Sequence, residues 1–549
     1  MNVKSLRGLL WLIVLLVLAA VACDFTAGDG PPRNAVVVDV VANSSLGNWL
    51  SGAVQRFNEA EIETAEGDPA YVQLTLADAG QAAADIAGGE LSPALWVPDD
   101  GVWTQVLADQ GNVAYTRDCT SLATSPLVIA MWRTAAESLG WPGQPLGWLD
   151  VGSLAADPSA WAYYSGGEFG DSLNLGHTHP GLSASGASTL LALVQSAQAK
   201  SDAVTVEDVE QPIVQASVSA FEAAVSWFSS NTGDLGRTMA DRGPAFLGAA
   251  VMYESDVVGN GNGQIVPIYP LEGTFVADHP ACLNNDLDAP TREAALLFRE
   301  FLLDVEAQQL AVSSGLRPVN DAAEIGPPLD AAHGVDLDQP ATVFGAPSVQ
   351  TLYAVQDLWQ SARKDVNLVM LLDVSGSMAG QKIDNMRDAA VQFVEQMGDD
   401  DFITIIPFSH ELPVLVYHQQ VGPERQGIIE AVRQLEAAGD TALYDAIGAG
   451  AQLIAESTSP DTANALVVLT DGQDTYSYQY NFDQALIDMA AANNTTVFTI
   501  AYGSDADERV LTQLAYGANG NFFLGDEASI AAIYEEMSAA FGGSVGIGR

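Results

Sequence analysis

The sequence has few basic residues, few cysteines and no long apolar run after its first segment. Lys and Arg together number 20 against 70 Asp and Glu, which gives a formal net charge of −50 over 549 residues. Nucleic-acid binding needs clustered Lys and Arg to pair with phosphates, so this composition argues against a nucleic-acid partner. The excess of carboxylates favours divalent cations and basic partners, although an acidic surface that only maintains solubility explains it more simply.

The familiar catalytic motifs are missing as well. The chain has no nucleophile elbow, no phosphate-binding loop and no His-Glu-x-x-His helix. His177 and His179 are spaced by one residue, and Asp278 and His279 lie further along, but a zinc site needs another clustered ligand. A histidine pair satisfied by backbone groups is therefore favoured. We expect a binding protein and not an enzyme.

The only run that looks like a membrane-directed segment is at the N-terminus. Lys4 and Arg7 precede an apolar core and small residues that end at Cys23, so residues 1–22 are predicted to be a signal peptide. The cysteine at its end resembles that of bacterial lipoprotein signals, which implies cleavage before Cys23 and lipid on that residue. An ordinary signal or an uncleaved anchor helix are the alternatives. Residues 23–34, rich in Gly and Pro, are predicted to be a lipidated tether that leaves the exported chain on the outer or periplasmic face of the cell membrane.

Two cysteines remain after Cys23. In an exported chain, Cys119 and Cys282 most simply form one disulfide, which would close a long loop. Two separate buried thiols are the alternative.

Alternating oxygens follow a buried strand in the C-terminal third. The apolar run 366–372 predicts the strand, and helical spacing of apolar residues begins after Lys382. Asp373, Ser375 and Ser377 therefore lie on a strand-to-helix turn, which in an open α/β sheet is at the ligand-binding edge. Oxygen ligands of this kind suit Mg²⁺, Mn²⁺ or Ca²⁺.

Two further segments place oxygens at element ends, namely Thr441 in a loop and Asp471 after a second apolar strand. The three segments together resemble the von Willebrand factor type A domain with its metal-ion-dependent adhesion site. The resemblance covers residues 366–543 and implies a doubly wound, Rossmann-like fold. It also implies that Asp373, Ser375, Ser377, Thr441 and Asp471 hold Mg²⁺ (or Mn²⁺ or Ca²⁺), and that a protein partner supplies a carboxylate to the metal. A serine-rich turn that caps a helix is the alternative.

The first part of the chain alternates strands and helices whose first residues are often serine. Its order resembles the two-lobed extracellular solute-binding proteins of ABC transporters, over residues 35–345, with residues 346–365 as a linker helix. The resemblance implies a solute between the lobes. Asp78 is where the oxyanion-binding branch often has serine, so the ligand class stays open. The implied contacts, for each of which helix capping is the alternative, are Ser44, Ser45, Ser125, Ser183 and Ser185.

Three functions follow from these patterns. The first is a membrane-anchored binding protein whose C-terminal domain binds another protein through the metal. The second is a substrate-binding receptor of an ABC-type transport system that captures a small-molecule solute, with the C-terminal domain as a docking module. The third, a metal-dependent hydrolase, would need Asp440 or Asp445 as a base and is the least supported.

Overall fold

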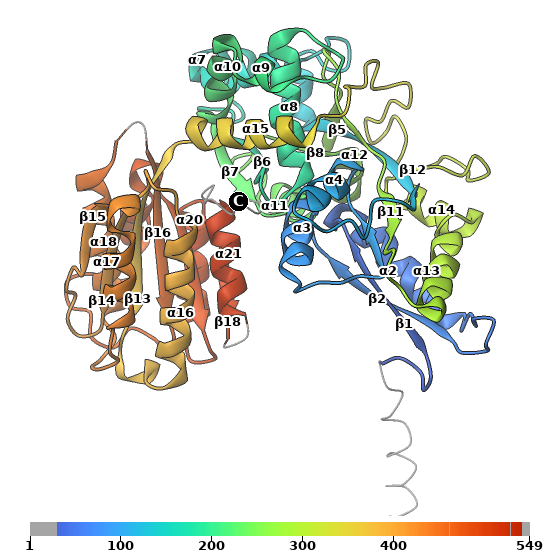
Figure 1. The fold of residues 1–549 in the computed structure, drawn as a ribbon. Coiled ribbons are helices and arrows are strands. Elements are labelled where there is room, and N and C mark those ends of the chain that lie inside the picture. The colour runs from blue at the N-terminus through green and yellow to red at the C-terminus, as the bar shows by residue number, and fades with distance from the viewer. Residues whose placement is uncertain (1–29, 460–461, 527–528, 541–549) are drawn as a thin grey trace, which may run out of the picture.

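The computed structural model describes residues 30–459, 462–526 and 529–540, and these form three sheets covered by helices (Figure 1). The predicted signal peptide and Cys23 lie outside the described residues. Within the described part, no helix combines the length and the apolar character needed to cross a membrane. The mixed α/β class predicted from the sequence is confirmed, with two lobes followed by a Rossmann-like domain.

The first lobe is built on a five-stranded sheet with the order β2-β1-β3-β11-β4. Its first strand is rich in valine, which suits a pleated, buried surface, and the next helix places Trp49, Leu50, Ala53 and Phe57 on one buried face. The elements of this lobe are β1 (Val36–Ala42), η1 (Ser44–Leu46), α2 (Gly47–Glu59), β2 (Ala70–Leu76), α3 (Ala79–Gly88), β3 (Leu95–Val97), α4 (Val102–Asp109), β4 (Cys119–Ser121), β11 (Pro280–Leu283), α13 (Ala289–Leu302) and α14 (Val305–Ser313).

The second lobe is a sheet with the order β10-β5-β8-β6-β7, to which β9 and β12 add by pairing with β5. Helix α8 is buried along most of its length, so it forms the centre of this lobe. The elements are β5 (Ala123–Trp132), α5 (Arg133–Ser138), α6 (Trp148–Ala156), α7 (Pro158–Ser165), β6 (Leu175–Thr178), α8 (Ala184–Gln198), α9 (Val206–Val209), α10 (Pro212–Glu222), β7 (Val225–Ser229), α11 (Thr232–Arg242), β8 (Ala249–Tyr253), α12 (Glu254–Gly261), β9 (Ile265–Ile268), β10 (Val276–Ala277) and β12 (Arg317–Pro318).

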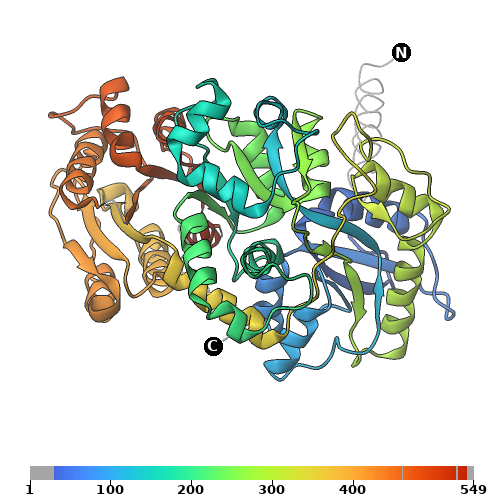
Figure 2. The same ribbon diagram turned by 90° about the horizontal axis from the view of Figure 1, so that it is seen from above.

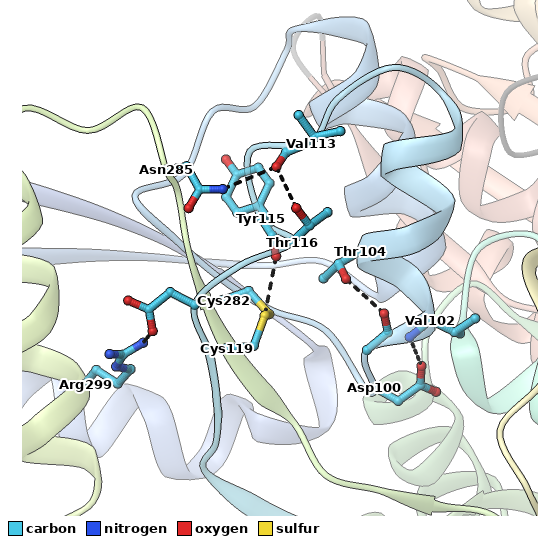
Figure 3. Close-up of a disulfide and its surroundings, with 12 residues drawn as sticks. Asp100, Val102, Thr104, Val113, Tyr115, Thr116, Cys119, Cys282, Asn285 and Arg299 are labelled. Atoms are coloured by element: carbon cyan, nitrogen blue, oxygen red, sulfur yellow. Dashed lines mark hydrogen bonds and ion pairs between the residues drawn. A yellow bond between two sulfur atoms is a disulfide. The ribbon is translucent and has the colours of Figure 1, made fainter.

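A disulfide joins Cys119 of β4 to Cys282 of β11, at the point where the chain leaves the first lobe and where it returns (Figure 3). The two residues are partners in the antiparallel register, and 163 positions separate them in sequence. The loop that the bond closes therefore contains nearly all of the second lobe.

Helix α15 (Val349–Ala362) connects the lobes to the C-terminal domain. The sequence predicts a linker helix here, but α15 is packed into the core of the second lobe through Leu352, Val355 and Trp359. The indole nitrogen of Trp359 donates to Glu222 at 3.0 Å. The helix is therefore a structural part of the lobes, and only two residues separate it from the next strand.

The C-terminal domain has a six-stranded sheet with the order β15-β14-β13-β16-β17-β18, parallel except for β15. Successive side chains of β13 point to opposite faces of the sheet and enter two different cores. Leu368 and Met370 belong to one core, and Val369 and Leu371 belong to the other. This is expected for a central strand that is covered by helices on both faces. The elements are β13 (Asp365–Asp373), η2 (Gly376–Met378), α16 (Gln381–Gln396), β14 (Phe402–Phe408), β15 (Val416–Gln420), α17 (Val421–Arg433), α18 (Leu443–Ser457), β16 (Thr462–Thr470), α19 (Gln484–Ala491), η3 (Ala492–Asn494), β17 (Thr496–Tyr502), α20 (Glu508–Gly517), β18 (Phe522–Gly525) and α21 (Ile530–Ala540).

The C-terminal domain lies beside the second lobe, on the side away from the first lobe (Figures 1 and 2). Trp227 of β7 stacks on Phe498 of β17 with ring centroids 5.7 Å apart. Arg242 of α11 lies over the ring of Tyr516 and donates to the carbonyl of Gly520 at 2.5 Å. Stacked aromatic and cation–π contacts therefore tie the two units together beyond the covalent link through α15.

Candidate functional site

The carboxyl end of β13 brings together the first three predicted metal-binding residues. Asp373 is fully buried, and its Oδ1 accepts a hydrogen bond from the backbone N–H of Ser375 at 2.8 Å. The hydroxyls of Ser375 and Ser377 lie 3.0 Å apart, and Ser377 donates to Oδ1 of Asp471 at 2.7 Å. Because β13 and β16 are parallel neighbours, their carboxyl ends meet at one edge and place the two carboxylates together.

The loop before α18 adds Thr441 to the same edge. A Cβ built on Gly472 would lie 3.7 Å from the Thr441 hydroxyl, so this side chain faces the turn that follows Asp471. The backbone N–H of Gly376 donates to the carbonyl of Gly439 at 2.9 Å and thereby joins this loop to the β13 turn. The structure thus gathers all five predicted residues at one place.

Burial and charge shape the acidity of this cluster. Burial raises the pKa of Asp373, the hydrogen bonds from Thr470 and Ser375 oppose that rise, and the nearby charge of Asp471 adds to it. Lys382 of α16 lies 2.5 Å from Oδ2 of Asp471, so one positive charge already compensates that buried carboxylate. Two carboxylates and three hydroxyls form an oxygen-only donor set, which fits a hard divalent cation.

Two neighbours of the cluster were not predicted from the sequence. Thr470 donates its hydroxyl to Oδ2 of Asp373 at 2.6 Å, and Lys382 pairs with Asp471. Thr470 directly precedes Asp471, so the strand-end motif itself could have suggested it. Lys382 gave no such signal, because its contact spans 89 positions.

Asp440 and Asp445, the two candidate bases of the hydrolase alternative, have different surroundings. Asp440 is exposed in the loop before α18. The carboxylate of Asp445 accepts from the backbone N–H groups of Tyr478, Gln479 and Tyr480 at 2.8 to 3.1 Å. With three donors bound, Asp445 holds in place the loop that follows Asp471.

In the N-terminal part, Asp78 is the centre of the predicted serine cluster. Its Oδ1 accepts from the N–H and hydroxyl of Ser44 at 3.1 and 2.5 Å, and its Oδ2 accepts from the Ser183 hydroxyl at 2.5 Å. Thr232, which was not predicted from the sequence, donates to Oδ2 through its N–H and its hydroxyl, each at 3.2 Å. Ser185 lies behind them, 2.9 Å from the Thr232 hydroxyl.

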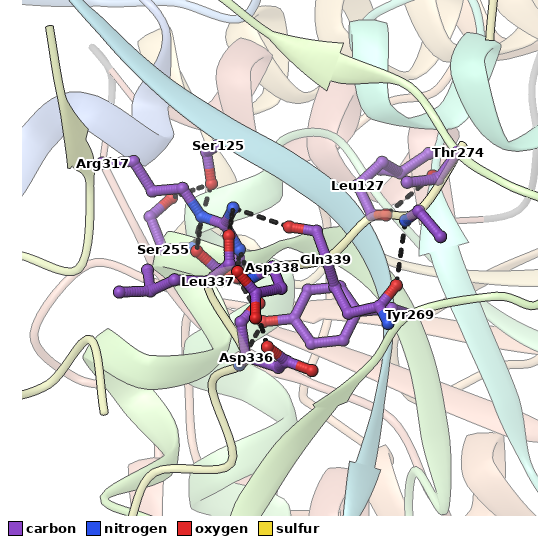
Figure 4. A network of polar contacts seen from close by, with 12 residues as sticks. Ser125, Leu127, Ser255, Tyr269, Thr274, Arg317, Asp336, Leu337, Asp338 and Gln339 are labelled. Carbon is purple, nitrogen blue, oxygen red and sulfur yellow. Dashed lines mark hydrogen bonds and ion pairs between the residues drawn. The ribbon is translucent and has the colours of Figure 1, made fainter. Parts of the chain in front are cut away.

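The other two predicted serines lie in separate networks. Ser45 donates to the side-chain oxygen of Asn43, whose amide in turn donates to the buried carboxylate of Asp99. Ser125 contacts the hydroxyl of Ser255 at 3.2 Å and accepts from its backbone N–H at 3.1 Å (Figure 4). Ser45 thus makes a local contact of the capping type. Ser125 lies in strand β5 and not at a helix start as predicted, and it contacts the first turn of α12, 130 positions away.

The histidines named in the zinc hypothesis are dispersed. His177 contacts the carboxylate of Glu222 at 3.1 Å, and both side chains are fully buried. Burial lowers the pKa of His279 to about 3, so its ring is neutral at physiological pH. Among the residues that the structure describes, no group of three or more His, Cys, Asp or Glu side chains is arranged to hold a metal ion.

A cavity of about 490 Å³ lies between the lobes. Trp103 and Tyr253 line it, together with Phe344 from the segment that precedes α15. Two carboxyl groups, Asp100 and Asp278, also face it. Burial raises the pKa of both, that of Asp100 to about 6.

The raised pKa of Asp100 predicts a pH-dependent effect of Asp100→Asn. The pKa of Asp100 is higher in the folded protein than in the unfolded chain, so the folded state binds this proton more tightly. Above about pH 6 Asp100 is ionised in the folded protein, and its buried charge lowers the free energy of unfolding. This loss of stability disappears as the pH falls towards 3.8. The variant, which can still accept from Val102, is expected to be more stable by at most about 3 kcal/mol at pH 7.5 and unchanged at pH 4. Thermal melts at both pH values test this. The control is Asp202→Asn, which replaces an exposed carboxylate and should leave the melting temperature unchanged at either pH.

Comparisons with known proteins divide the chain into the same two parts. Residues 38–317, about half of the chain, match the model of the bacterial extracellular solute-binding protein family, and residues 367–536 match that of the von Willebrand factor type A domain. The periplasmic binding protein AfuA of Actinobacillus pleuropneumoniae, solved with fructose-6-phosphate, aligns at 12% identity over 59% of this chain and 95% of its own, with a TM-score of 0.42.

Relatives of the C-terminal part are also known. An uncharacterized protein of Synechocystis is 31% identical over 163 residues, which are 29% of this chain and 37% of that protein. Inter-alpha-trypsin inhibitor heavy chain H4 of Sus scrofa is 25% identical over 182 residues, 31% of this chain and 19% of its own, so the chain spans well under half of either relative. A von Willebrand factor type A protein of Catenulispora acidiphila aligns at 22% identity over 32% of this chain and 42% of its own, with a TM-score of 0.30. The chain therefore belongs to the bacterial extracellular solute-binding protein family, and a von Willebrand factor type A domain follows its solute-binding domain.

Proposed function

We propose that this protein is an exported binding protein that attaches to another protein through a divalent metal at its von Willebrand factor type A domain. The observation that carries the proposal is the gathering of Asp373, Ser375, Ser377, Thr441 and Asp471 at one sheet edge. The set holds only two carboxylates, and Lys382 already pairs with one of them, so a divalent cation held there keeps net positive charge.

Some residues of the site would bind the metal, and others orient the residues that bind it. Ser375, Ser377 and Thr441 would hold Mg²⁺ or a similar cation through their hydroxyls, while Asp373 and Asp471 act directly or through water. Thr470 fixes the orientation of Asp373, and Lys382 moderates the charge of Asp471. When bound, the metal supplies an electrophilic position for a carboxylate of the partner protein. The same domain is proposed to bind and not to catalyse.

Metal-dependent melting of the full chain tests this proposal. Mg²⁺, Mn²⁺ or Ca²⁺ is expected to raise one transition of the wild type relative to chelator, by about 2.7 kcal/mol at a hundredfold excess over Kd. Asp373→Ala and Ser375→Ala should lose this stabilisation and remain folded. Asp388→Ala removes an exposed carboxylate of α16 and serves as the matched control, which should respond like the wild type. A wild type that melts identically with metal and with chelator would overturn the proposal.

The anchor belongs to the same proposal. Cleavage before Cys23 and lipid on its thiol and amine would hold the protein at the cell membrane, with residues 23–34 as the tether. Mass spectrometry of the N-terminal peptide from membrane-extracted protein tests this, and an unmodified Cys23 would contradict it.

The cavity between the lobes favours a second candidate function, a receptor that captures a small solute for a permease. Asp100 and Asp278 in its wall suit a neutral or cationic solute better than an anion. A solute that binds only the folded state must raise stability, so a panel of amines, sugars and amino acids should contain at least one that raises the melting temperature. The second candidate predicts that such a shift survives Asp373→Ala, and a panel without any shift would count against it.

A further inference from the structure

The carboxylate of Asp78 lies in a cradle that belongs to both lobes. Asp78 is the N-cap residue of α3, but its side chain makes no capping bond to that helix. It turns instead towards Ser44 in the first lobe and towards Ser183 and Thr232 in the second. Asp78 and Ser44 are thus the first lobe's contribution to a polar contact that crosses the cleft.

Everything that contacts this carboxylate is a donor. Five hydrogen bonds reach it, from the backbone N–H groups and hydroxyls of Ser44 and Thr232 and from the hydroxyl of Ser183. Ser183 and Thr232 open α8 and α11, of 15 and 11 residues, and the N-terminal ends of helices favour negative charge. The side chains of Asp78, Ser183 and Thr232 have at most 3% of their surface exposed. The second-lobe side of the cradle is therefore dry, and its donors are complementary to an anion. Burial raises the pKa of Asp78, and the hydrogen bonds from Ser183, Ser44 and Thr232 oppose that rise.

The backbone around Asp78 closes the cleft tightly. The N–H of Gln81 donates to the carbonyl of Leu182 in the second lobe at 3.0 Å. A Cβ on Gly80 would come within 2.3 Å of the Gly181 carbonyl oxygen, so only glycine permits this approach. The two lobes therefore touch directly beside the cradle.

We propose that Asp78 is a built-in anion. Its carboxylate occupies an interlobe oxyanion cradle, holds the lobes closed without a ligand and prevents small oxyanions from entering. This goes beyond the proposed metal-dependent binding, which concerns the C-terminal domain, and beyond the proposed solute capture, which concerns the neighbouring cavity. The proposal restricts an external solute to the neighbouring cavity, and it predicts that removal of the carboxylate leaves a vacancy with the chemistry of a carboxylate site.

Chemical rescue of Asp78→Gly in the full chain tests the proposal. The variant should melt at least about 5 °C below the wild type, because several charge-assisted hydrogen bonds are lost at once. Sodium formate should restore most of that loss in a saturable manner, whereas sodium chloride at equal ionic strength should not. The wild type should show no formate-specific shift. Asp288→Gly, which removes an exposed N-cap carboxylate from α13, is the matched control and should not be rescued. Equal responses of Asp78→Gly to formate and chloride would overturn the proposal.

Asp78→Asn keeps the test decisive if the glycine variant does not fold. This variant fills the same space without the charge and presents an amide N–H₂ to a cradle of donors. It should melt below the wild type, gain nothing from formate and show a larger radius of gyration in small-angle scattering as the lobes part. An Asp78→Asn protein with the wild-type melting temperature and scattering would show that the carboxylate does not hold the lobes, which contradicts the proposal.

Discussion

Replacing Cys119 and Cys282 together by alanine is expected to lower the unfolding free energy of the solute-binding domain by about 2–5 kcal/mol. The bond closes a loop of 163 positions that contains nearly all of the second lobe, so its loss frees a large conformational ensemble in the unfolded chain. Calorimetry of the full chain should show one transition shifted to lower temperature while that of the C-terminal domain stays in place.

A reducing agent provides the internal control for this prediction. Dithiothreitol should shift the wild type to the melting temperature of the double variant, and it should leave the double variant unchanged. Lack of any shift in the reduced wild type would show that the cross-link contributes nothing measurable.

Asp401→Ala is expected to destabilise the C-terminal domain by about 3–5 kcal/mol. Asp401 receives the guanidinium of Arg363 at 3.0 and 3.2 Å, and both side chains are at most 4% exposed. It also accepts from the backbone N–H groups of Val366 and Gly398 at 2.9 and 2.7 Å. The variant leaves the buried guanidinium of Arg363 and the N–H groups of Val366 and Gly398 without their carboxylate partner. Arg363 directly follows α15, and Val366 is at the start of β13.

The ion pair between Asp384 and Arg387 on α16 offers the matched comparison. Asp384 is 57% exposed, and Arg387 keeps its hydrogen bond to the carbonyl of Leu435 when the pair is broken. Asp384→Ala should therefore cost less than about 1 kcal/mol. Denaturant unfolding measures both variants, and similar losses for the two would contradict the role assigned to burial.

Much of the C-terminal fold and site was predictable because it depends on short-range patterns. The apolar run before Asp373, the turn through Ser375 and Ser377 and the helical spacing after Lys382 each lie within a few residues of one another. Since parallel strands end at a common edge, the position of Asp471 after its own strand was enough to expect it beside Asp373. The structure has these residues together, and whether they hold a metal stays a prediction.

The N-terminal site was only partly predictable. Ser44, Ser183 and Ser185 were recognised as oxygens at helix starts, but Ser45 and Ser125 were predicted on the same basis and bond elsewhere. Helix starts with serine are common because the hydroxyl satisfies free backbone N–H groups, so the pattern does not say which of them share a cleft. Thr232 was not predicted, because a threonine at a helix start likewise does not show that it faces the cleft.

The sequence by itself determined the α/β alternation, the order of the two domains and the local geometry of the β13 turn, because these follow from hydrophobic periodicity and from the conformational preferences of neighbouring residues. Only the tertiary structure decided that Asp78 meets Thr232, 154 positions away, that Lys382 meets Asp471, and that α15 is packed against the second lobe. Such contacts depend on how two lobes and two sheets pack, and that packing is set by the sum of many burial terms that no short segment contains.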